Sequence, residues 1–254
     1  MPTFPSPEAE RLFKKERLAL VFRILHRFGM AEGIAGHCSM RDPVDPSTFW
    51  VNPQGRSFAL MKQSDLAQCR VEDGAVIESG NLPIDASATS IHSQIYRARG
   101  PSANALVHVH SPSTKAFSAL GRTLDMISQD ACAYYQEQVL VPFGGAVFDN
   151  EEGLRIARLL GSEKKIAILQ NHGILAVGSL AIEEAAWWMI NFDMCCKAQL
   201  LADAALRPGE EYVVASEAHI LASKHEMGSP EMGWFSLAAY IDEEEHHSQG
   251  AHKL

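Results

Sequence analysis

The chain has few cysteines, and they follow no pattern that would organise a fold. Its 254 residues include five cysteines, an odd number, and no C-x-x-C pair. A disulfide framework or a cysteine-rich structural zinc site is therefore not expected, and a reducing compartment is favoured.

Basic clusters are also missing. The formal net charge is −9 and acidic residues are scattered along the chain, which disfavours nucleic acid and anionic membranes as partners.

Long apolar runs are missing as well. The first residues lack the basic start and apolar stretch of a secretory signal, and no segment is long enough to cross a bilayer. We therefore expect a cytoplasmic protein with no membrane contact. A hydrophobic content of 46% is ordinary for a globular protein and suffices for a large core.

Helical and extended patterns alternate along the chain. Helices are expected from the Ser6-Pro7 start, over 85–99, after Ser111-Pro112, over 153–160 and over 180–205, and a short strand is expected around Val147. We find no repeat or linker, so residues 8–241 are expected to form a single domain of the α/β class with a mixed sheet layered by helices. Residues 242–254 are polar enough to predict a disordered tail.

Two histidines stand at the end of a predicted strand, in the segment Ala105–Pro112. Alternate residues of a strand point to the same side, so His108 and His110 share one face. Two neutral imidazoles at this spacing are able to hold one metal ion, although such pairs also occur as hydrogen-bonded residues at a sheet edge.

A third histidine occupies a predicted hairpin tip. Asn171-His172-Gly173 joins two apolar runs, which places His172 where strands end and sites gather. Three histidines on β elements, with a fourth coordination position left for water or substrate, are typical of a catalytic zinc site.

Five motifs together resemble the class II aldolase/adducin family, whose zinc-dependent enzymes include sugar-phosphate aldolases and a pentulose-phosphate 4-epimerase. They occur in the family's order over roughly residues 10 to 205: Gly33–Ser39, Asn52–Gly55, the helix containing His92, His108–His110, and Asn171–Gly173. The resemblance implies a three-layer fold in which helices cover a central mixed, mostly antiparallel sheet. It also implies a cyclic homotetramer with active sites between subunits.

By the same resemblance His108, His110 and His172 bind Zn²⁺, with Mn²⁺ or Co²⁺ as alternatives. The implied substrate is a small carbonyl compound. The metal would stabilise an enolate or enediolate as a neighbouring bond breaks.

One position departs from the family's aldolases, which carry a Glu general acid/base four residues before the helix histidine. Here that position is Ala88, and a methyl group cannot carry a proton. His37 is one candidate replacement, and the other catalytic candidates are Asp85, Tyr134, Tyr135 and Glu137. The tyrosine pair is favoured because the family uses an aromatic hydroxyl from the adjacent subunit, although such a pair is also typical of interface packing.

The family's phosphate-binding positions also differ. A Gly-Asn turn, a Thr-Gly turn and a Ser-Ser pair are replaced by Gly36-His37, Gln54-Gly55 and Ala86-Ser87, which leaves fewer small donors. A non-phosphorylated oxo or hydroxy acid is therefore favoured. The substrate-binding candidates are His37, Gln54, Gly55, Ser87 and His92. Alternatively, His37 is a buried hydrogen-bonding residue and His92 merely packs in its helix.

Three functions remain open from the sequence. The first is a metal-dependent lyase that acts next to a carbonyl by retro-aldol cleavage or decarboxylation. The second is a metal-dependent epimerase, isomerase or dehydratase. The third is an adducin-like scaffold without catalysis, which the loss of Glu at position 88 favours and the three retained histidines oppose.

Overall fold

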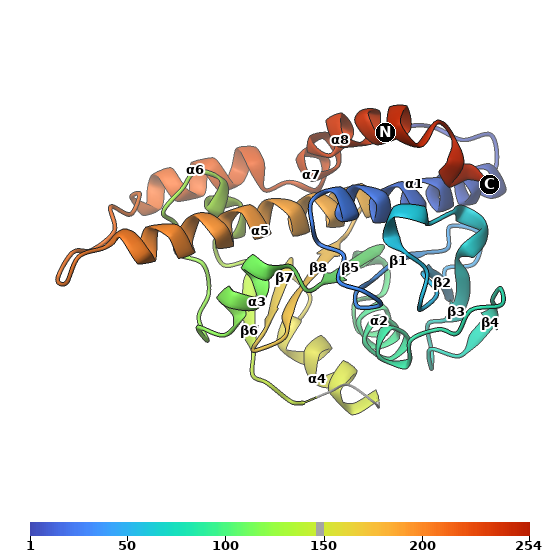
Figure 1. Ribbon diagram of the computed structural model, residues 1–254, viewed down its shortest axis with the longest axis horizontal. Coiled ribbons are helices and arrows are strands. Elements are labelled where there is room, and N and C mark those ends of the chain that lie inside the picture. The colour runs from blue at the N-terminus through green and yellow to red at the C-terminus, as the bar shows by residue number, and fades with distance from the viewer. Residues whose placement is uncertain (146–149) are drawn as a thin grey trace.

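An eight-stranded sheet, counted over the residues that this computed structural model describes, 1–145 and 150–254, runs through the molecule (Figure 1). Its spatial order is β4-β3-β2-β1-β5-β8-β7-β6. Only the β6–β7 pair is parallel among the strand pairs of the described chain. The strands are β1 His37–Arg41, β2 Thr48–Val51, β3 Ala67–Arg70, β4 Val76–Glu78, β5 Ala105–Val109, β6 Gln138–Val141, β7 Ile166–Leu169 and β8 Gly173–Gly178.

Helices cover both faces of the sheet. In Figure 1, α1 and α5 cross one face, α2 and α4 lie on the other, and α6 to α8 lie outside α1 and α5. The bounds are α1 Pro7–Arg27, α2 Ala86–Arg99, α3 Pro112–Ser118, α4 Asn150–Leu160, α5 Ile182–Ala205, α6 Glu217–Met227, α7 Pro230–Ser236 and α8 Ala238–Ser248. This confirms the expected three layers and the mixed, mostly antiparallel sheet.

Two apolar cores fill the space between the layers. One unites buried side chains of α1 and α5 with alternate residues of the central strands, such as Val107 and Val109. The other unites α2 and α4 with residues of opposite parity, such as Leu106 and Leu175. The period of two along β5 therefore divides its side chains between the two cores.

Side-chain caps explain where several helices begin. Ser6 accepts a hydrogen bond from the backbone N–H of Ala9 at the start of α1, and Asp85 accepts one from Ser87 at the start of α2. Ser111 similarly caps α3, where Pro112 occupies the first turn. These residues satisfy backbone donors that have no partner inside the helix, and they confirm the helix starts that the sequence predicts. The strand expected around Val147 lies outside the described residues.

The polar C-terminal segment is ordered, so the predicted disordered tail at residues 242–254 is wrong. Helix α8 continues to Ser248, and a short 3-10 turn follows at Ala251–Lys253. Glu244 and His252 are buried, and Arg27 on α1 pairs with Glu243 and Glu244. The segment is polar because its acidic side chains face basic residues of α1, which lie more than two hundred positions earlier. None of the helices in the described part of the chain is long and apolar enough to span a membrane.

Candidate metal centre

The three predicted ligands converge at one end of the central strands. His108 lies on β5, His110 follows that strand directly, and His172 lies in the turn between β7 and β8. One ring nitrogen from each histidine lies within 4.8 Å of the others. The Nε2 atoms of His108 and His110 are 2.9 Å apart, and the ring centroids of His110 and His172 are separated by 4.6 Å.

Backbone geometry in the β7–β8 turn brings His172 to this place. Asn171 has a φ of 56°, a left-handed conformation that Asn tolerates better than most residues. Gly173 has no side chain, and a Cβ at this position would lie 2.8 Å from the carbonyl oxygen of Val109 and 3.2 Å from Cδ2 of His110. The Asn-His-Gly sequence therefore provides both the turn and the close approach of β8 to the end of β5.

Burial keeps the three imidazoles neutral. Desolvation holds the pKa of His108 well below its ordinary value of 6.5, and it lowers the pKa of His110 to about 4. It also lowers the pKa of His172. At neutral pH each ring therefore has one nitrogen lone pair, which is what a metal ligand requires.

A hydrogen bond sets the orientation of His108, the central candidate ligand. His108 Nδ1 lies 2.8 Å from the carbonyl oxygen of Ile174. Because a carbonyl only accepts, the ring proton is on Nδ1 and the Nε2 lone pair faces His110. Three neutral imidazoles, one of them oriented in this way, form a donor set that suits Zn²⁺.

Two further histidines lie beside the triad. His37 on β1 is the cross-strand partner of His108 on β5, and their ring centroids are 4.8 Å apart. His37 Nδ1 is 2.7 Å from Nε2 of His92 on α2, and both side chains are buried. The structure thus brings His37 and His92 together with the cluster, and His92 makes its contact through His37.

Sequence reasoning missed three residues that hold this pair. Ser39 Oγ lies 2.5 Å from His92 Nδ1 and 2.8 Å from the hydroxyl of Tyr96. The Asn52 side chain accepts a hydrogen bond from the backbone N–H of Cys38, next to His37. The available signal was spacing: Ser39 is two residues from His37 on a strand, and Tyr96 is four from His92 on a helix.

The other substrate-binding candidates lie near the start of α2. The backbone N–H of Gln54 donates to the carbonyl oxygen of Pro83 at 2.8 Å. This contact brings the Gln54-Gly55 turn close to the start of α2, where Asp85 accepts a hydrogen bond from the backbone N–H of Ser87. The Asp85 carboxylate caps α2 rather than standing free. Ala88 is fully buried in the apolar core of the α2 face.

The remaining catalytic candidates are not brought to the cluster within the chain. The Tyr134 hydroxyl is buried in the core of the opposite face and donates to Asn191 on α5. Tyr135 donates to Glu217, and Glu137 pairs with Lys224, so both contact α6. The expectation that Tyr134 supplies a proton is not supported, because its hydroxyl is enclosed and already bonded.

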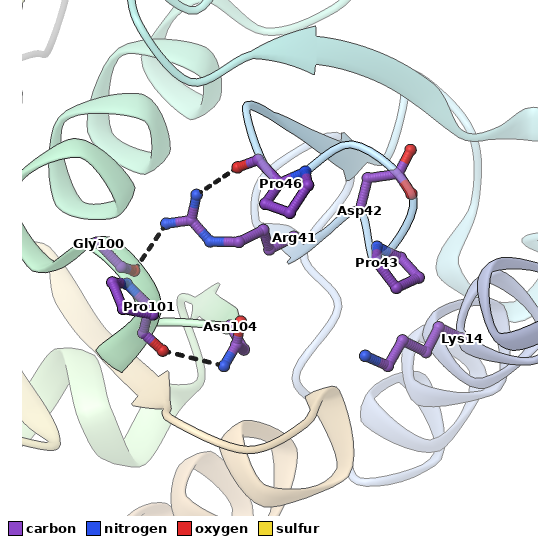
Figure 2. Close-up of a pocket in the computed structure, with 8 residues that line it drawn as sticks. All are labelled: Lys14, Arg41, Asp42, Pro43, Pro46, Gly100, Pro101 and Asn104. Carbon is purple, nitrogen blue, oxygen red and sulfur yellow. Dashed lines mark hydrogen bonds between the residues drawn. The ribbon is translucent and has the colours of Figure 1, made fainter. Parts of the chain in front are cut away.

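A separate cavity lies at the opposite end of β1. It has a volume of about 330 Å³, and Figure 2 shows Arg41 and Lys14 among its lining residues. The Arg41 guanidinium donates to the carbonyls of Pro46 and Gly100 (Figure 2), and also to those of Ala103 and Tyr96. Arg41 therefore joins loops at this end of the sheet, four residues along β1 from His37.

Known proteins are similar to this chain in sequence and in fold. The sequence profile of the class II aldolase and adducin N-terminal domain matches residues 16–200. The decarboxylase NovR of Streptomyces niveus is 35% identical over 237 residues, which cover 92% of this chain and 85% of that protein. A protein of Streptomyces roseochromogenus subsp. oscitans, named 4-hydroxy-3-prenylphenylpyruvate oxygenase/4-hydroxy-3-prenylbenzoate synthase, is 35% identical over 92% of this chain and 83% of its own length.

A solved structure is similar over almost the whole chain. The L-fuculose 1-phosphate aldolase from Glaciozyma antarctica PI12 superposes with a TM-score of 0.89 at 37% identity, covering 99% of this chain and 96% of that chain. The chain belongs to the class II aldolase and adducin family, and its relatives include decarboxylases and aldolases.

Proposed function

We propose that this protein is a metal-dependent lyase that cleaves a carbon–carbon bond next to the carbonyl of a non-phosphorylated oxo or hydroxy acid. The observation that carries the proposal is the convergence of His108, His110 and His172 within 4.8 Å. A decarboxylase and an aldolase among the similar proteins support the reaction class. The buried, unpaired cysteines suit a reducing, cytoplasmic location.

His108, His110 and His172 would hold the ion, with Zn²⁺ as the first choice. When bound, the ion supplies a positive charge that stabilises negative charge developing on a carbonyl oxygen. The chain's own residues orient and desolvate the site. Ile174 fixes the tautomer of His108 through its carbonyl oxygen, and burial keeps the imidazoles free of protons that would compete with the ion.

The residue at position 88 favours decarboxylation over retro-aldol cleavage. Retro-aldol cleavage requires a base to remove the proton of the substrate hydroxyl, and Ala88 cannot act as one. In decarboxylation the carboxylate is already ionised, so the bond breaks without a protein base. Carbon dioxide leaves, and the carbon that remains takes its proton from water. Full burial of Ala88 in an apolar core means that its position offers no space for a charged replacement.

A homotetramer with active sites between subunits remains part of the proposal. Exposed apolar side chains occur on loops beside the cluster, which supports an interface there. Ile34 is 63% exposed and lies two residues before Gly36, whose α-carbon faces the carbonyl of His108. Phe143 is 57% exposed, and its backbone N–H donates to Gln170, two residues before His172.

Metal analysis and a simple decarboxylation assay test the proposal together. Purified protein is expected to hold one Zn²⁺ per chain and to accelerate carbon dioxide release from oxaloacetate above the rate of free Zn²⁺ at the same concentration. His108→Ala is expected to lose the ion and the activity, whereas His219→Ala, which changes an exposed histidine of α6, keeps both. Protein that holds no divalent ion after incubation with zinc would overturn the proposal.

A further inference from the structure

Four buried side chains form a continuous chain of hydrogen bonds that ends at the metal centre. The Tyr96 hydroxyl lies 2.8 Å from Ser39 Oγ, and Ser39 Oγ lies 2.5 Å from His92 Nδ1. His92 Nε2 lies 2.7 Å from His37 Nδ1. Tyr96, Ser39 and His92 have no exposed surface, and His37 is 3% exposed. We call these four residues the Tyr96–His37 relay.

The buried tyrosine sets the direction of the relay. If Tyr96 donates to Ser39, then Ser39 donates to His92 and His92 donates through Nε2 to His37. Each donor then has an acceptor, and the remaining proton of His37 is on its Nε2 atom. In the reverse direction the Tyr96 hydroxyl would need an acceptor other than Ser39, and the described residues offer none. A buried hydroxyl without an acceptor is destabilising, so the first direction is favoured.

This direction determines what His37 can do beside the cluster. His37 lies across from His108 on the neighbouring strand, and the described residues provide no hydrogen-bond partner for its Nε2 atom. A bare Nε2 would be a potential fourth ligand for the ion, whereas an Nε2–H group is a donor and cannot coordinate. The relay therefore leaves the centre with three protein ligands and an open position, as catalytic sites require.

We infer that His37 is a substrate-binding donor, held as the Nε2–H tautomer by the relay, and that it takes an oxygen of the carboxylate of a 2-oxo acid. This inference rests on the proposed function and names its substrate class. A 2-oxo acid carries its ketone and carboxylate oxygens on adjacent carbons. One substrate molecule therefore offers the ketone oxygen to an ion and a carboxylate oxygen to a hydrogen-bond donor beside that ion. A charged oxygen also forms a stronger hydrogen bond than a sugar hydroxyl does.

The bond that breaks in such a substrate lies between C3 and C4. The electron pair of that bond forms a C2–C3 double bond, and the ketone oxygen on C2 takes the negative charge. C4 leaves as carbon dioxide when it is a carboxylate, and C3 then takes a proton from water. The C1 carboxylate stays hydrogen-bonded to His37 throughout the reaction, so the Tyr96–His37 relay loses no proton.

The tautomer of His37 is measured directly by NMR. Protein labelled with ¹⁵N-histidine and loaded with zinc is expected to show a protonated Nε2 for both His37 and His92 in long-range ¹H–¹⁵N spectra. Tyr96→Phe removes the first donor of the relay and is expected to weaken this preference at His37. Tyr134→Phe removes an equally buried hydroxyl that bonds to Asn191 instead, and it is expected to leave the tautomer unchanged. A protonated Nδ1 on His37 in the unaltered protein overturns the inference.

Binding of pyruvate and of its neutral analogue pyruvamide tests the role of the donor. In calorimetric titrations of zinc-loaded protein, His37→Leu is expected to weaken pyruvate binding about tenfold and to reduce the preference for pyruvate over pyruvamide. His37→Gln, which places an amide N–H near the former Nε2, is expected to recover most of the affinity. Both variants are expected to retain one zinc per chain, since His37 is not a ligand.

The two proposals fail in different ways. Absence of zinc uptake by the unaltered protein overturns the proposed function and this inference together. Full zinc uptake with unchanged pyruvate binding by His37→Leu overturns the inference alone. Loss of zinc from His37→Leu and His37→Gln also overturns it, because that result makes His37 a ligand.

Discussion

Gly173 lies directly against the end of β5, and a Cβ at this position would come within 2.8 Å of the carbonyl oxygen of Val109. The same atom would be 3.2 Å from Cδ2 of His110. The absence of a side chain at Gly173 therefore determines how close the turn that carries His172 comes to the end of β5, where the other two candidate ligands lie.

Gly173→Ala is expected to disturb both stability and metal binding. The added methyl group must displace backbone, which costs about 1–3 kcal/mol of unfolding free energy, and it separates His110 from His172. We expect a lower urea midpoint and at least about tenfold weaker zinc binding, one order of magnitude being about 1.4 kcal/mol. Gly80→Ala is the matched control, because a Cβ there would meet no atom within 4 Å. Equal zinc affinities in both variants would contradict the prediction.

Acid is expected to destabilise the metal-free protein through His92. Burial lowers the pKa of His92 from 6.5 to about 3, so between these values the unfolded chain binds a proton that the folded chain does not. Stability from this group is therefore present above pH 6.5 and is lost as the pH falls toward 3. Between pH 7 and 5 the loss is about 2 kcal/mol.

Urea unfolding at the two pH values checks this expectation. His92→Gln is expected to remove that part of the pH dependence, while His219→Gln, on the exposed surface of α6, keeps the slope of the unaltered protein. A slope that is the same in all three proteins would mean that His92 does not contribute.

Deleting residues 242–254 is expected to lower stability by roughly 1–3 kcal/mol. The deletion removes most of α8 together with the buried side chains of Glu244 and His252. It also leaves Arg27 on α1 without its two acidic partners. The urea midpoint of the shortened chain measures the effect, and an unchanged midpoint would show that the segment does not dock in solution.

A smaller change checks the same interface. Glu244→Gln weakens the ion pair with Arg27 at a buried position and is expected to lower the urea midpoint. Glu226→Gln, on the exposed surface of α6, is expected to leave the urea midpoint unchanged.

Arg41→Lys is expected to destabilise the end of the sheet opposite the candidate metal centre. The Arg41 guanidinium donates to the carbonyls of Ala103, Pro46, Tyr96 and Gly100, and a lysine ammonium cannot reach all of these acceptors. The expected cost is about 1–3 kcal/mol in thermal or urea unfolding, with zinc content unchanged. Arg158→Lys, on the exposed surface of α4, serves as the control, and an equal effect of both substitutions would count against the bracing role of Arg41.

The elements that carry the three candidate ligands were predictable because their signals are local. The alternation at His108 and His110 and the Asn-His-Gly turn at His172 each lie within a few residues, and strand and turn geometry fixes which way such side chains point. Family resemblance supplied the expectation that these segments meet. The caps at Ser6 and Ser111 were likewise visible as start signals next to apolar periodic segments.

The rest depended on contacts between distant segments. Order in α8 follows from acidic side chains that face Arg17 and Arg27, and nothing near α8 in the sequence indicates those partners. His37 pairs with His92 because β1 lies against α2, and the two histidines are 55 residues apart in the sequence. The burial of the Tyr134 hydroxyl against α5 is also a long-range property, so nothing in the sequence was a reason to discard Tyr134 as a catalytic candidate.

The order β1-β5-β8 at the centre of the sheet has a consequence for folding. His37, His108 and His172 come from segments more than sixty residues apart along the chain. β1 must pair with β5, and β5 with β8, before the three histidines become neighbours. Pairings of this kind close long loops and form slowly. Tight binding of an ion by His108, His110 and His172 would therefore require β5 and β8 to have paired, and an ion present during refolding would favour this pairing over unpaired intermediates.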